Sequence, residues 1–265
     1  MTPTSHGVPF IALGSRLRDV PEVTTLGVRP NFFDYTQTER ALILESPLVL
    51  YPTRHYAKFL STLDRRIFPS LENHLYADEK ILQTTLFQML GITHPRTRFY
   101  FRRHCDDILK DFRFPFITKV PRASSRGRGV FMINREKELQ EYLAMTRVAY
   151  VQEYLPHERD LRVILINYEP VLAYWRLRSP CGFKTNLSQG GEAVFDGVPL
   201  DGVEFAAHCA RKCRFDDVGL DLIPHHGRWY LIEANMKYGR KGLEMQGLKL
   251  KDIMRKKLLN GEITN

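Results

Sequence analysis

Hydrophobic residues recur along this chain with two different periods, one typical of helices and one typical of strands. In residues 78–90 the apolar positions are three or four apart, which predicts an amphipathic helix. Asp78 suits the N-cap of this helix and Gly91 suits its C-terminal end. Further helices are expected at residues 55–65, 136–146, 202–215 and 249–257.

Short apolar runs bounded by turn residues predict strands. They lie at residues 8–13, within 41–51, at 99–101, 114–120, 130–133, 150–155, 161–166 and 171–175, and in a hairpin at 218–235. The first part of the chain therefore reads as a small α/β lobe. The later succession of helices, strands and hairpins predicts an α+β protein whose sheets are mostly antiparallel.

The hairpin at residues 218–235 carries three oxygen-bearing side chains. Glu233 and Asn235 are two residues apart, so they face the same way on a strand, and the turn brings Asp221 roughly opposite Glu233. Neighbouring carboxylates among apolar residues are costly to bury unless a cation holds them. Such oxygen ligands suit Mg²⁺. A solvated hairpin face is the alternative, and the apolar surroundings favour the metal.

Composition places the chain among soluble globular proteins. Its 265 residues are 43% hydrophobic and 26% charged, which is ordinary. No run approaches the length of a membrane span, and the N-terminal residues lack the pattern of a signal peptide. We therefore expect a cytoplasmic protein. The cysteines Cys105, Cys181, Cys209 and Cys213 form no CxxC pair, so unpaired thiols in a reducing compartment are expected.

A net charge of +9 indicates an anionic partner. Basic residues gather at 122–128 and at 249–257, where a solvated helix face is the simpler interpretation. The sequence contains no RNP-like motif, zinc finger or KH loop, so nucleic acid is the weaker hypothesis. A nucleotide or another small anion fits the charge better.

Three further segments hold residues that suit a phosphate-bearing ligand. The loop 122–129 is rich in serine, arginine and glycine, and such loops cover phosphates, although an ordinary surface loop fits as well. Lys119 precedes it on an apolar strand and needs an anion there, unless its stem reaches solvent. The basic cluster at 176–186 suits a phosphoryl group in transfer or a charged surface loop equally. Composition alone makes 152–160 an ordinary strand and turn.

Taken in order, these segments resemble the ATP-grasp superfamily, and most closely its RimK-type branch of ribosomal-protein glutamate ligases. The resemblance covers about residues 75–245. It rests on Lys119, Gly127-Arg-Gly129, Gln152-Glu153, Asp160-Leu-Arg162, Arg176, Phe183-Lys-Thr-Asn186, Gly190-Gly191, Gly219-Leu-Asp221 and Glu233-Ala-Asn235, with Gly239 and Gly242 after them.

The resemblance implies an ATP-grasp fold, in which two α+β lobes hold ATP between them. Residues 76–149 would be the small lobe with the phosphate-covering loop, 150–265 the large lobe with the magnesium site, and 1–75 a short preceding α/β lobe. Asp221 and Glu233 would hold one Mg²⁺, and Glu233 with Asn235 the other, with Mn²⁺ as a substitute.

Roles for the remaining site residues follow from the same resemblance. Lys119 and Lys80 would contact phosphates of ATP, and Arg176 with Lys184 would serve catalysis. The other nucleotide contacts would be Ser125, Gly127 and Gly129 in the covering loop, Gln152, Glu153, Tyr154, Leu155 and Asp160 near adenine and ribose, and Thr185 and Asn186, beside Lys184, near the γ-phosphate.

The resulting hypothesis is an ATP-dependent ligase that joins a carboxylate to an amine through an acyl phosphate. Its partners would be ATP, a small-molecule or peptide carboxylate and an amine acceptor, with no membrane and with a homo-oligomer as an option. One alternative is an ATP-grasp kinase-type phosphotransferase. Another is a non-catalytic nucleotide- or RNA-binding protein, which the positive charge favours but the acidic residues of the hairpin do not.

Overall fold

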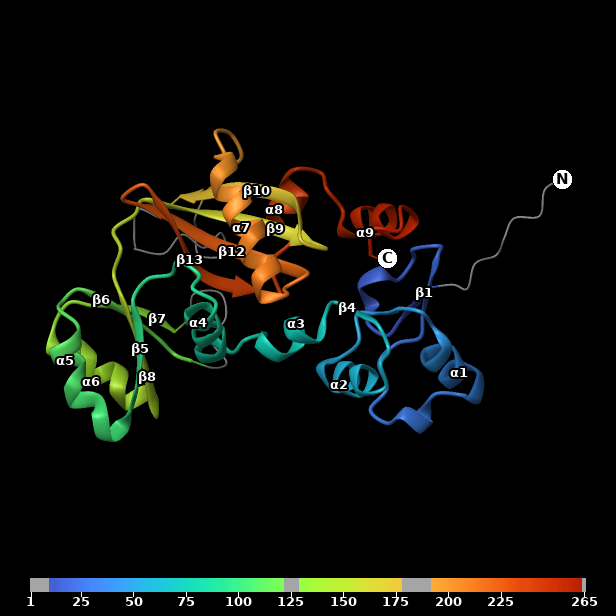
Figure 1. The fold of residues 1–265 in the computed structure, drawn as a ribbon, viewed down its shortest axis with the longest axis horizontal. Coiled ribbons are helices and arrows are strands. Elements are labelled where there is room, and N and C mark those ends of the chain that lie inside the picture. Colours follow the sequence, from blue (N-terminus) through green and yellow to red (C-terminus); the bar gives the residue numbers. More distant parts are fainter. Residues whose placement is uncertain (1–9, 122–128, 178–191, 264–265) are drawn as a thin grey trace. The chain divides into compact units, whose positions relative to one another are not determined.

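The computed structural model describes residues 10–121, 129–177 and 192–263. They belong to two compact units, whose elements are labelled in Figure 1. The first unit comprises Met1–Leu75, Arg214–Asp217 and Arg240–Asn265, and the second comprises Tyr76–Cys213 and Val218–Gly239, each as far as it is described. The division at residues 76 and 150 drawn from the sequence stays a prediction.

The first unit is built on a four-stranded parallel sheet in the order β2-β1-β3-β4. Its strands are β1 (Phe10–Ala12), β2 (Val23–Thr25), β3 (Val49–Leu50) and β4 (Ile67–Phe68). Its helices are α1 (Gln37–Glu45), α2 (Arg54–Thr62), α3 (Leu71–Tyr76), α8 (Lys241–Met245) and α9 (Leu250–Leu259), and the last residue of α3 is assigned to the second unit. Short 3₁₀ helices lie at Ser15–Leu17 and Phe32–Asp34. Ile11, Ile43 and Tyr56 belong to its buried core. The expectation of a small α/β lobe at the start of the chain is therefore confirmed.

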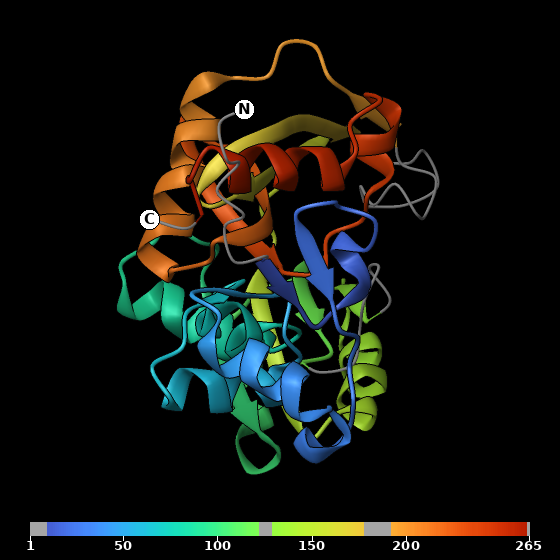
Figure 2. The ribbon, with the colours of Figure 1, turned by 90° about the vertical axis from the view of Figure 1, so that its right-hand side faces the viewer.

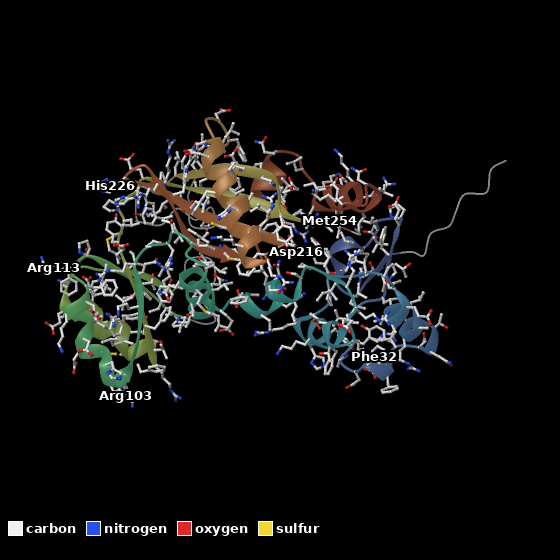
Figure 3. All side chains as sticks on the ribbon, viewed as in Figure 1. Phe32, Arg103, Arg113, Asp216, His226 and Met254 are labelled. Atoms are coloured by element: carbon white, nitrogen blue, oxygen red, sulfur yellow. The ribbon has the colours of Figure 1, made fainter. Side chains whose placement is uncertain are left out.

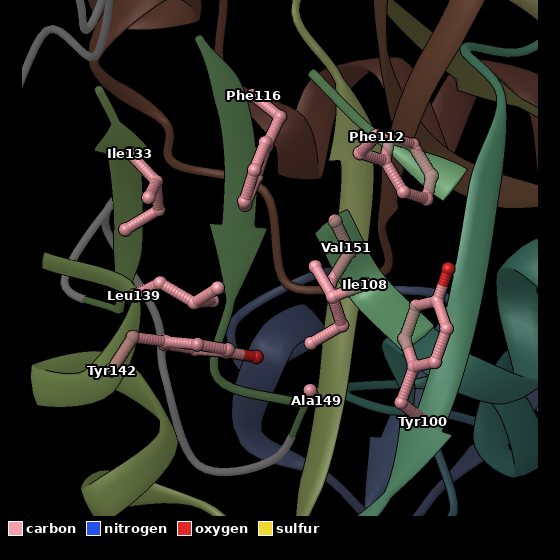
Figure 4. Close-up of a cluster of buried hydrophobic side chains, with 9 residues drawn as sticks. All are labelled: Tyr100, Ile108, Phe112, Phe116, Ile133, Leu139, Tyr142, Ala149 and Val151. Carbon is pink, nitrogen blue, oxygen red and sulfur yellow. The ribbon is translucent and has the colours of Figure 1, made fainter. Parts of the chain in front are cut away.

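The second unit contains two antiparallel sheets. The smaller has the order β5-β8-β6-β7. Its elements are β5 (Thr97–Phe101), β6 (Phe116–Lys119), β7 (Val130–Ile133), β8 (Val148–Glu153), α4 (Lys80–Met89), α5 (Ile108–Asp111), α6 (Glu136–Met145) and a 3₁₀ helix at Arg102–Asp107. Figure 4 shows how Leu139 and Tyr142 of α6 and Ile108 of α5 meet side chains such as Phe116 and Val151 of the sheet. Burial of these side chains fixes both helices on one face of the sheet.

The larger sheet has the order β11-β10-β9-β12-β13. Its strands are β9 (Arg159–Ile166), β10 (Glu169–Leu177), β11 (Glu192–Val194), β12 (Asp217–His225) and β13 (Arg228–Asn235). Helix α7 (Leu200–Cys213) packs along one face (Figures 1 and 2). At Gly202 a Cβ atom would lie 2.8 Å from Leu161, so Leu161 faces α7. Asp160 and Arg162 therefore project from the opposite face.

The helix expected at residues 78–90 is α4, and the structure corrects its start. Gly91 follows the helix with a φ of +63°, which glycine adopts easily. Asp78 is not the N-cap, because the helix begins at Lys80 and Glu79 holds that position. Among the described helices, none combines the length and apolarity that a membrane crossing requires.

The apolar stretch at residues 41–51 divides between two elements. It contains β3, as expected, but its first half belongs to α1. A capping box formed by Thr36 and Glu39 starts that helix, a helix that was not predicted. Antiparallel sheets were expected for most of the chain. The two sheets of the second unit are antiparallel, whereas the strands of the first unit pair in parallel.

Candidate functional site

The hairpin of β12 and β13 has the geometry that its sequence predicts. His225 pairs with Arg228, and the two turn residues, His226 and Gly227, have φ values of +46° and +72°. This is the sign pattern of the type I′ turn, whose twist suits a two-residue hairpin. His226 lies at the tip (Figure 3). Further along, Asp221 pairs directly with Glu233.

A β-bulge in β13 arranges the polar residues of the hairpin. Leu222 pairs with Leu231, whereas Asp221 pairs with Glu233, so Ile232 is an extra residue. Leu231 is buried and the next buried side chain is Ala234, three positions later. The bulge thus changes which residues of the strand face inward. Glu233 is placed opposite Asp221, although Leu231 two positions earlier lies in the core.

Asp221 is held by arginines of the neighbouring strands. Arg162 of β9 donates from Nε to Oδ1 and from Nη2 to Oδ2, the latter at 2.8 Å. Nη2 of Arg176 of β10 lies 3.0 Å from Oδ1. Asn235 donates its side-chain amide to Oδ2 at 3.2 Å. The carboxylate predicted as a metal ligand is therefore the centre of a buried ion-pair network.

Arg176 is also clamped by Asp160. The two residues are direct cross-strand partners, and Arg176 donates from Nε and Nη2 to the two carboxylate oxygens at 2.6 and 2.9 Å. The sequence placed Asp160 beside the nucleotide. Both oxygens of Asp160 are turned to Arg176, itself a predicted site residue, and the nucleotide contact of Asp160 stays a prediction.

These charges form an alternating row across β10, β9 and β12. Asp160, Arg162, Arg176 and Asp221 are 3–7% exposed, and two arginines balance two aspartates. Burial opposes the charged guanidinium of Arg176, yet Asp160 and Asp221 outweigh it and raise the pKa of Arg176. Burial likewise opposes the ionised form of Asp221, yet Arg162 and Arg176 leave its pKa lowered. The attraction between the opposite charges therefore offsets the cost of burying Arg176 and Asp221.

Two lysines approach the acidic hairpin from the smaller sheet and from α4. Lys119 of β6 is 4% exposed, and its Nζ lies 3.5 Å from the carbonyl oxygen of Ile232 in the bulge. Burial lowers the pKa of Lys119, while Glu233 and Asp221 act in the opposite direction. Nζ of Lys80 lies 3.5 Å from Oε1 of Glu233. Both lysines predicted to contact phosphate are thus brought to the hairpin.

The side-chain amide of Gln83 attaches helix α4 to the hairpin. It forms the backbone hydrogen bonds that a neighbouring strand would otherwise form. Gln83 donates to the carbonyl of Ala234 at 2.9 Å and accepts from the N–H of Ala234 at 3.2 Å. Leu231 donates its N–H to the carbonyl of Thr93 at 2.9 Å. Because β13 is the edge of its sheet, these bonds satisfy backbone groups that would otherwise lack strand partners. They also keep Lys80 within reach of Glu233.

The aromatic ring of Tyr150 lies next to the ammonium group of Lys119. The ammonium of Lys119 lies 5.4 Å from the centroid of the Tyr150 ring, a distance at which cation–π attraction acts. The phenol is hydrogen-bonded to Thr84 at 2.8 Å, and Gln152 donates to it at 3.3 Å. Burial raises the pKa of Tyr150 to about 12, so the phenol stays neutral.

The residues expected to line the adenine and ribose pocket lie at the end of β8. Gln152 is buried and also donates to Thr97 at 2.9 Å. The carboxylate of Glu153 accepts the backbone N–H of Arg96. Leu155 is buried and Tyr154 is partly exposed. Among these four residues, the side chains of Gln152 and Glu153 form hydrogen bonds within the protein.

The covering loop and the basic cluster lie mainly outside the described residues. Gly129 is described: its carbonyl accepts the N–H of Val120 at 2.7 Å, next to the β6–β7 pair, and its φ is +119°. The predicted residues Ser125, Gly127, Lys184, Thr185 and Asn186 lie outside the described ranges.

The hairpin offers oxygen donors of the type that Mg²⁺ prefers. Among the described residues, no group of three or more His, Cys, Asp and Glu gathers, so the donor set is two carboxylates and one amide. The side chain of Glu233 is 28% exposed, whereas that of Asp221 is 6% exposed. By donor type the three residues fit a hard divalent cation, and Glu233 is the more accessible acid.

Sequence reasoning gave no role to Arg162 or Gln83. Arg162 stood in the quoted motif, and its spacing of two from Asp160 already placed both on one face of a strand. Gln83 lies three residues after Lys80 on α4, so the same helix face carries both. A buried glutamine beside an edge strand indicates such a contact, but Gln83 could not be recognised in this role without the strand order.

The chain is similar to known proteins of one family. Residues 77–258, well over half of the chain, match the family model described as RimK-like ATP-grasp domain. The coenzyme gamma-F420-2:alpha-L-glutamate ligase of Methanococcus maripaludis is 26% identical over 189 residues, covering 67% of this chain and 65% of the relative. A probable alpha-L-glutamate ligase of Parasynechococcus marenigrum is 27% identical over 192 residues, covering 67% and 41%. The matched stretch is less than two thirds of either relative.

Solved structures agree on the architecture. A RimK domain ATP-grasp protein from Sphaerobacter thermophilus superposes with a TM-score of 0.66 at 12% identity, covering 94% of this chain and 98% of that one. D-alanine–D-alanine ligase from Bacillus anthracis, in complex with ATP, gives 0.66 at 14% identity, covering 94% and 90%. At these identities the likeness establishes the fold alone. It confirms the expected α+β ATP-grasp fold.

Proposed function

Because this chain belongs to the RimK-like ATP-grasp family, we propose that it is an ATP- and Mg²⁺-dependent ligase that joins a carboxylate to an amine. The observation that carries the proposal is the pairing of Asp221 with Glu233 beside Lys80 and Lys119. Acidic residues for a metal and buried cations for phosphates thus meet at one hairpin. A metal-bound triphosphate needs both kinds of group.

The proposed reaction has two steps. A carboxylate oxygen of the first substrate attacks the γ-phosphorus of ATP, so that an acyl phosphate forms and ADP leaves. The amine nitrogen of the second substrate then attacks the acyl carbon, the bond to the phosphate oxygen breaks, and phosphate leaves as the amide forms. Charge accumulates on the transferred phosphoryl group, and positioned cations stabilise it. As the family resemblance implies, Lys119, Arg176 and Lys184 would do this work.

The nucleotide roles follow the same division. Lys80 and Lys119 would bind phosphate oxygens, and the end of β8, with Glu153, Tyr154 and Leu155, would receive adenine and ribose. Arg176 would act from its clamp between Asp160 and Asp221, which fixes the direction of the guanidinium. Preorganised charge of this kind is more effective than a flexible side chain because it need not reorient during the reaction.

Asp221, Glu233 and Asn235 would hold the magnesium ions. When bound, the metal would neutralise phosphate charge in the transition state. Glu233 lies between the other two in this proposal, since it pairs with Asp221 across the strands and shares a face with Asn235. Lys80 would balance its charge before nucleotide binds.

The names of the relatives suggest the first substrates to test. Both curated relatives are named as α-L-glutamate ligases, so we propose L-glutamate as the amine substrate. The carboxylate substrate would be an acid that carries no competing amine at the reacting end. Pools of carboxylic acids and peptides, each combined with L-glutamate, would identify it.

The test measures ADP release with ATP, Mg²⁺, L-glutamate and each acid, followed by mass spectrometry of the product. An amide product supports the ligase, whereas a phosphorylated product without an amide identifies a kinase. Glu233→Gln should abolish ADP release, because it removes the accessible acid. Glu169→Gln is the matched control, since Glu169 is an exposed glutamate that pairs with Arg211 on the same unit. Unchanged ADP release in Glu233→Gln would refute the metal assignment.

A further inference from the structure

The carboxylate of Asp221 has no acceptor position left for a metal. A carboxylate oxygen accepts about two hydrogen bonds. Oδ1 receives Nε of Arg162 and faces Nη2 of Arg176 at 3.0 Å. Oδ2 receives Nη2 of Arg162 at 2.8 Å and the amide of Asn235 at 3.2 Å. Arg162 alone engages both oxygens, in the side-by-side geometry that makes arginine–carboxylate pairs strong.

The backbone of β12 makes room for this arginine. At Gly219 a Cβ atom would lie 3.1 Å from Nη1 of Arg162 and 2.8 Å from Cβ of Tyr238. Gly219 and Asp221 are two residues apart on one strand and therefore share a face. Arg162 thus lies against the bare backbone at Gly219 while it holds Asp221. The missing side chain at Gly219 therefore leaves space for the guanidinium group.

Glu233 differs from Asp221 although the two are cross-strand partners. Glu233 forms an ion pair with Lys80 at 3.5 Å, and its side chain is 28% exposed. A compact ammonium at that distance is a weaker partner than a bidentate guanidinium. A divalent cation can therefore reach Glu233 directly, whereas at Asp221 it meets an arginine already in place.

We propose that Arg162 is a charge placeholder for a divalent cation at Asp221. The guanidinium and the cation compete for one carboxylate, so the cation binds fully only after Arg162 has released Asp221. This inference rests on the proposed function, which places magnesium at the hairpin. Burying Asp221 without any cation would be costly, and Arg162 supplies that cation while nucleotide is absent. The nucleotide-free protein consequently binds divalent cations weakly.

The first test is Mn²⁺ binding to the nucleotide-free protein, followed by electron paramagnetic resonance of the free ion. Arg162→Gln should tighten Mn²⁺ binding by about tenfold or more, because a strong charged competitor is removed. Arg159→Gln is the matched control: Arg159 is on the same strand, is exposed and lies over the ring of Trp175. It should leave Mn²⁺ binding unchanged. Equal or weaker binding in Arg162→Gln would overturn the proposal.

The second test uses thermal stability. Arg162→Gln should lower the melting temperature, and millimolar MgCl₂ should restore much of the loss, since the ion then takes the place of the arginine. The double variant Arg162→Gln/Asp221→Asn should gain nothing from MgCl₂. If Arg162→Gln fails to fold, Arg162→Lys keeps a charge but loses the bidentate contact, and it should show a smaller rise in Mn²⁺ affinity. Absence of that rise would also overturn the proposal.

Failure of this inference is distinguishable from failure of the proposed function. A wild-type protein that forms an amide, together with an Arg162→Gln variant that binds Mn²⁺ no more tightly, refutes the placeholder and leaves the ligase intact. Tighter Mn²⁺ binding in Arg162→Gln, with no ADP release by the wild type on any substrate pool, supports the placeholder and refutes the ligase.

Discussion

Arg176 lies directly opposite Asp160 across β9 and β10, and its Nε and Nη2 atoms reach the two carboxylate oxygens at 2.6 and 2.9 Å. The same Nη2 lies 3.0 Å from Asp221. Arg176, which we propose to be catalytic, is thus fixed by two acids of neighbouring strands. Asp160 therefore acts through Arg176, and we regard it as a positioning residue.

Asp160→Asn should impair turnover more than nucleotide binding. The substitution keeps the shape of the side chain but removes the charge that orients Arg176. We expect kcat to fall by about one to two orders of magnitude, because a misdirected cation stabilises the transition state less, with the KM for ATP nearly unchanged. Removing one partner of a buried ion pair should also cost about 3 kcal/mol in the free energy of unfolding.

The control for Asp160 is Asp201→Asn. Asp201 lies in the first turn of α7, is exposed and accepts the indole N–H of Trp229 at 3.0 Å, so its loss should leave kcat unchanged. Steady-state kinetics and urea denaturation measure both effects. An Asp160→Asn variant that loses ATP affinity while keeping kcat would show that Asp160 contacts the nucleotide after all.

Lys119→Met should separate stability from function. Lys119 is 4% exposed and burial lowers its pKa, so the fold bears a cost for the charge. Methionine has a similar length and no charge. We expect the free energy of unfolding to stay the same or rise by about 1–2 kcal/mol, while ATP affinity and ADP release fall by about a hundredfold or more.

Calorimetric titration with ATP and guanidinium denaturation measure these two effects on the same samples. Lys212→Met is the matched control, because Lys212 is an exposed lysine of α7 whose Nζ donates to the carbonyl of Leu90 at 3.2 Å. It should alter neither quantity. A Lys119→Met protein that binds ATP as tightly as the wild type would remove Lys119 from the phosphate site.

The sequence predicted the hairpin because its information is local. A turn fixes the register of its own strands, so Asp221 could be placed roughly opposite Glu233 without knowledge of the rest of the fold. The register of the two-residue turn by itself would pair Asp221 with Ile232, and the bulge shifts the partner to Glu233. The bulge at Ile232 was not predicted, because its signal, the burial of both Leu231 and Ala234, depends on what packs against the strand. The local pattern therefore predicted the hairpin and the neighbourhood of the two acids, but not the bulge that makes them direct partners.

The arginine network could not be derived in this way. Arg162 and Asp221 are 59 residues apart, and their contact depends on β9 lying next to β12 in the sheet. Strand order is a tertiary property. The sequence shows which residues are charged, but their spacing does not show which of them pair. The basic C-terminal helix shows the same limit. Its basic residues were expected on a solvated face, and Arg255 is indeed exposed. Its partner Glu22, 233 residues earlier in the sequence, could not be identified from spacing.

Gly219→Ala should disturb the site by steric contact. Its Cβ would lie 2.8 Å from Tyr238 and 3.1 Å from Arg162, closer than packed atoms tolerate. We expect a loss of about 1–3 kcal/mol in the free energy of unfolding, typical of overpacking. If displacement of Arg162 exposes Asp221, Mn²⁺ binding by the nucleotide-free protein should also tighten.

The matched control is Gly239→Ala. A Cβ atom at Gly239 meets nothing within 4 Å, so stability and Mn²⁺ affinity should both stay close to wild type. Chemical denaturation and Mn²⁺ titration of the two variants make the comparison. Equal stabilities of Gly219→Ala and Gly239→Ala would mean that Arg162 and Tyr238 can move aside without cost.

Asp216 should make the first unit less stable as the pH rises. The residue, labelled in Figure 3, is 8% exposed and accepts the N–H of Ser70 on both carboxylate oxygens. Burial, more than the neighbouring Asp217, raises its pKa from 3.8 to about 7. The folded protein therefore binds a proton that the unfolded chain has lost between these values. Its stabilising contribution is complete below pH 3.8 and is lost as the pH rises through 7.

Asp216→Asn isolates this effect because the amide keeps an acceptor for Ser70 and does not ionise. The free energy of unfolding of the wild type, relative to this variant, should fall by about 4 kcal/mol between pH 4 and pH 8. Urea denaturation at several pH values measures the difference and cancels the titration of other groups that the two proteins share. A difference that stays constant across this range would mean that Asp216 ionises at its ordinary pKa. In that case the two hydrogen bonds from Ser70 would be strong enough to offset its burial, because they favour the carboxylate form.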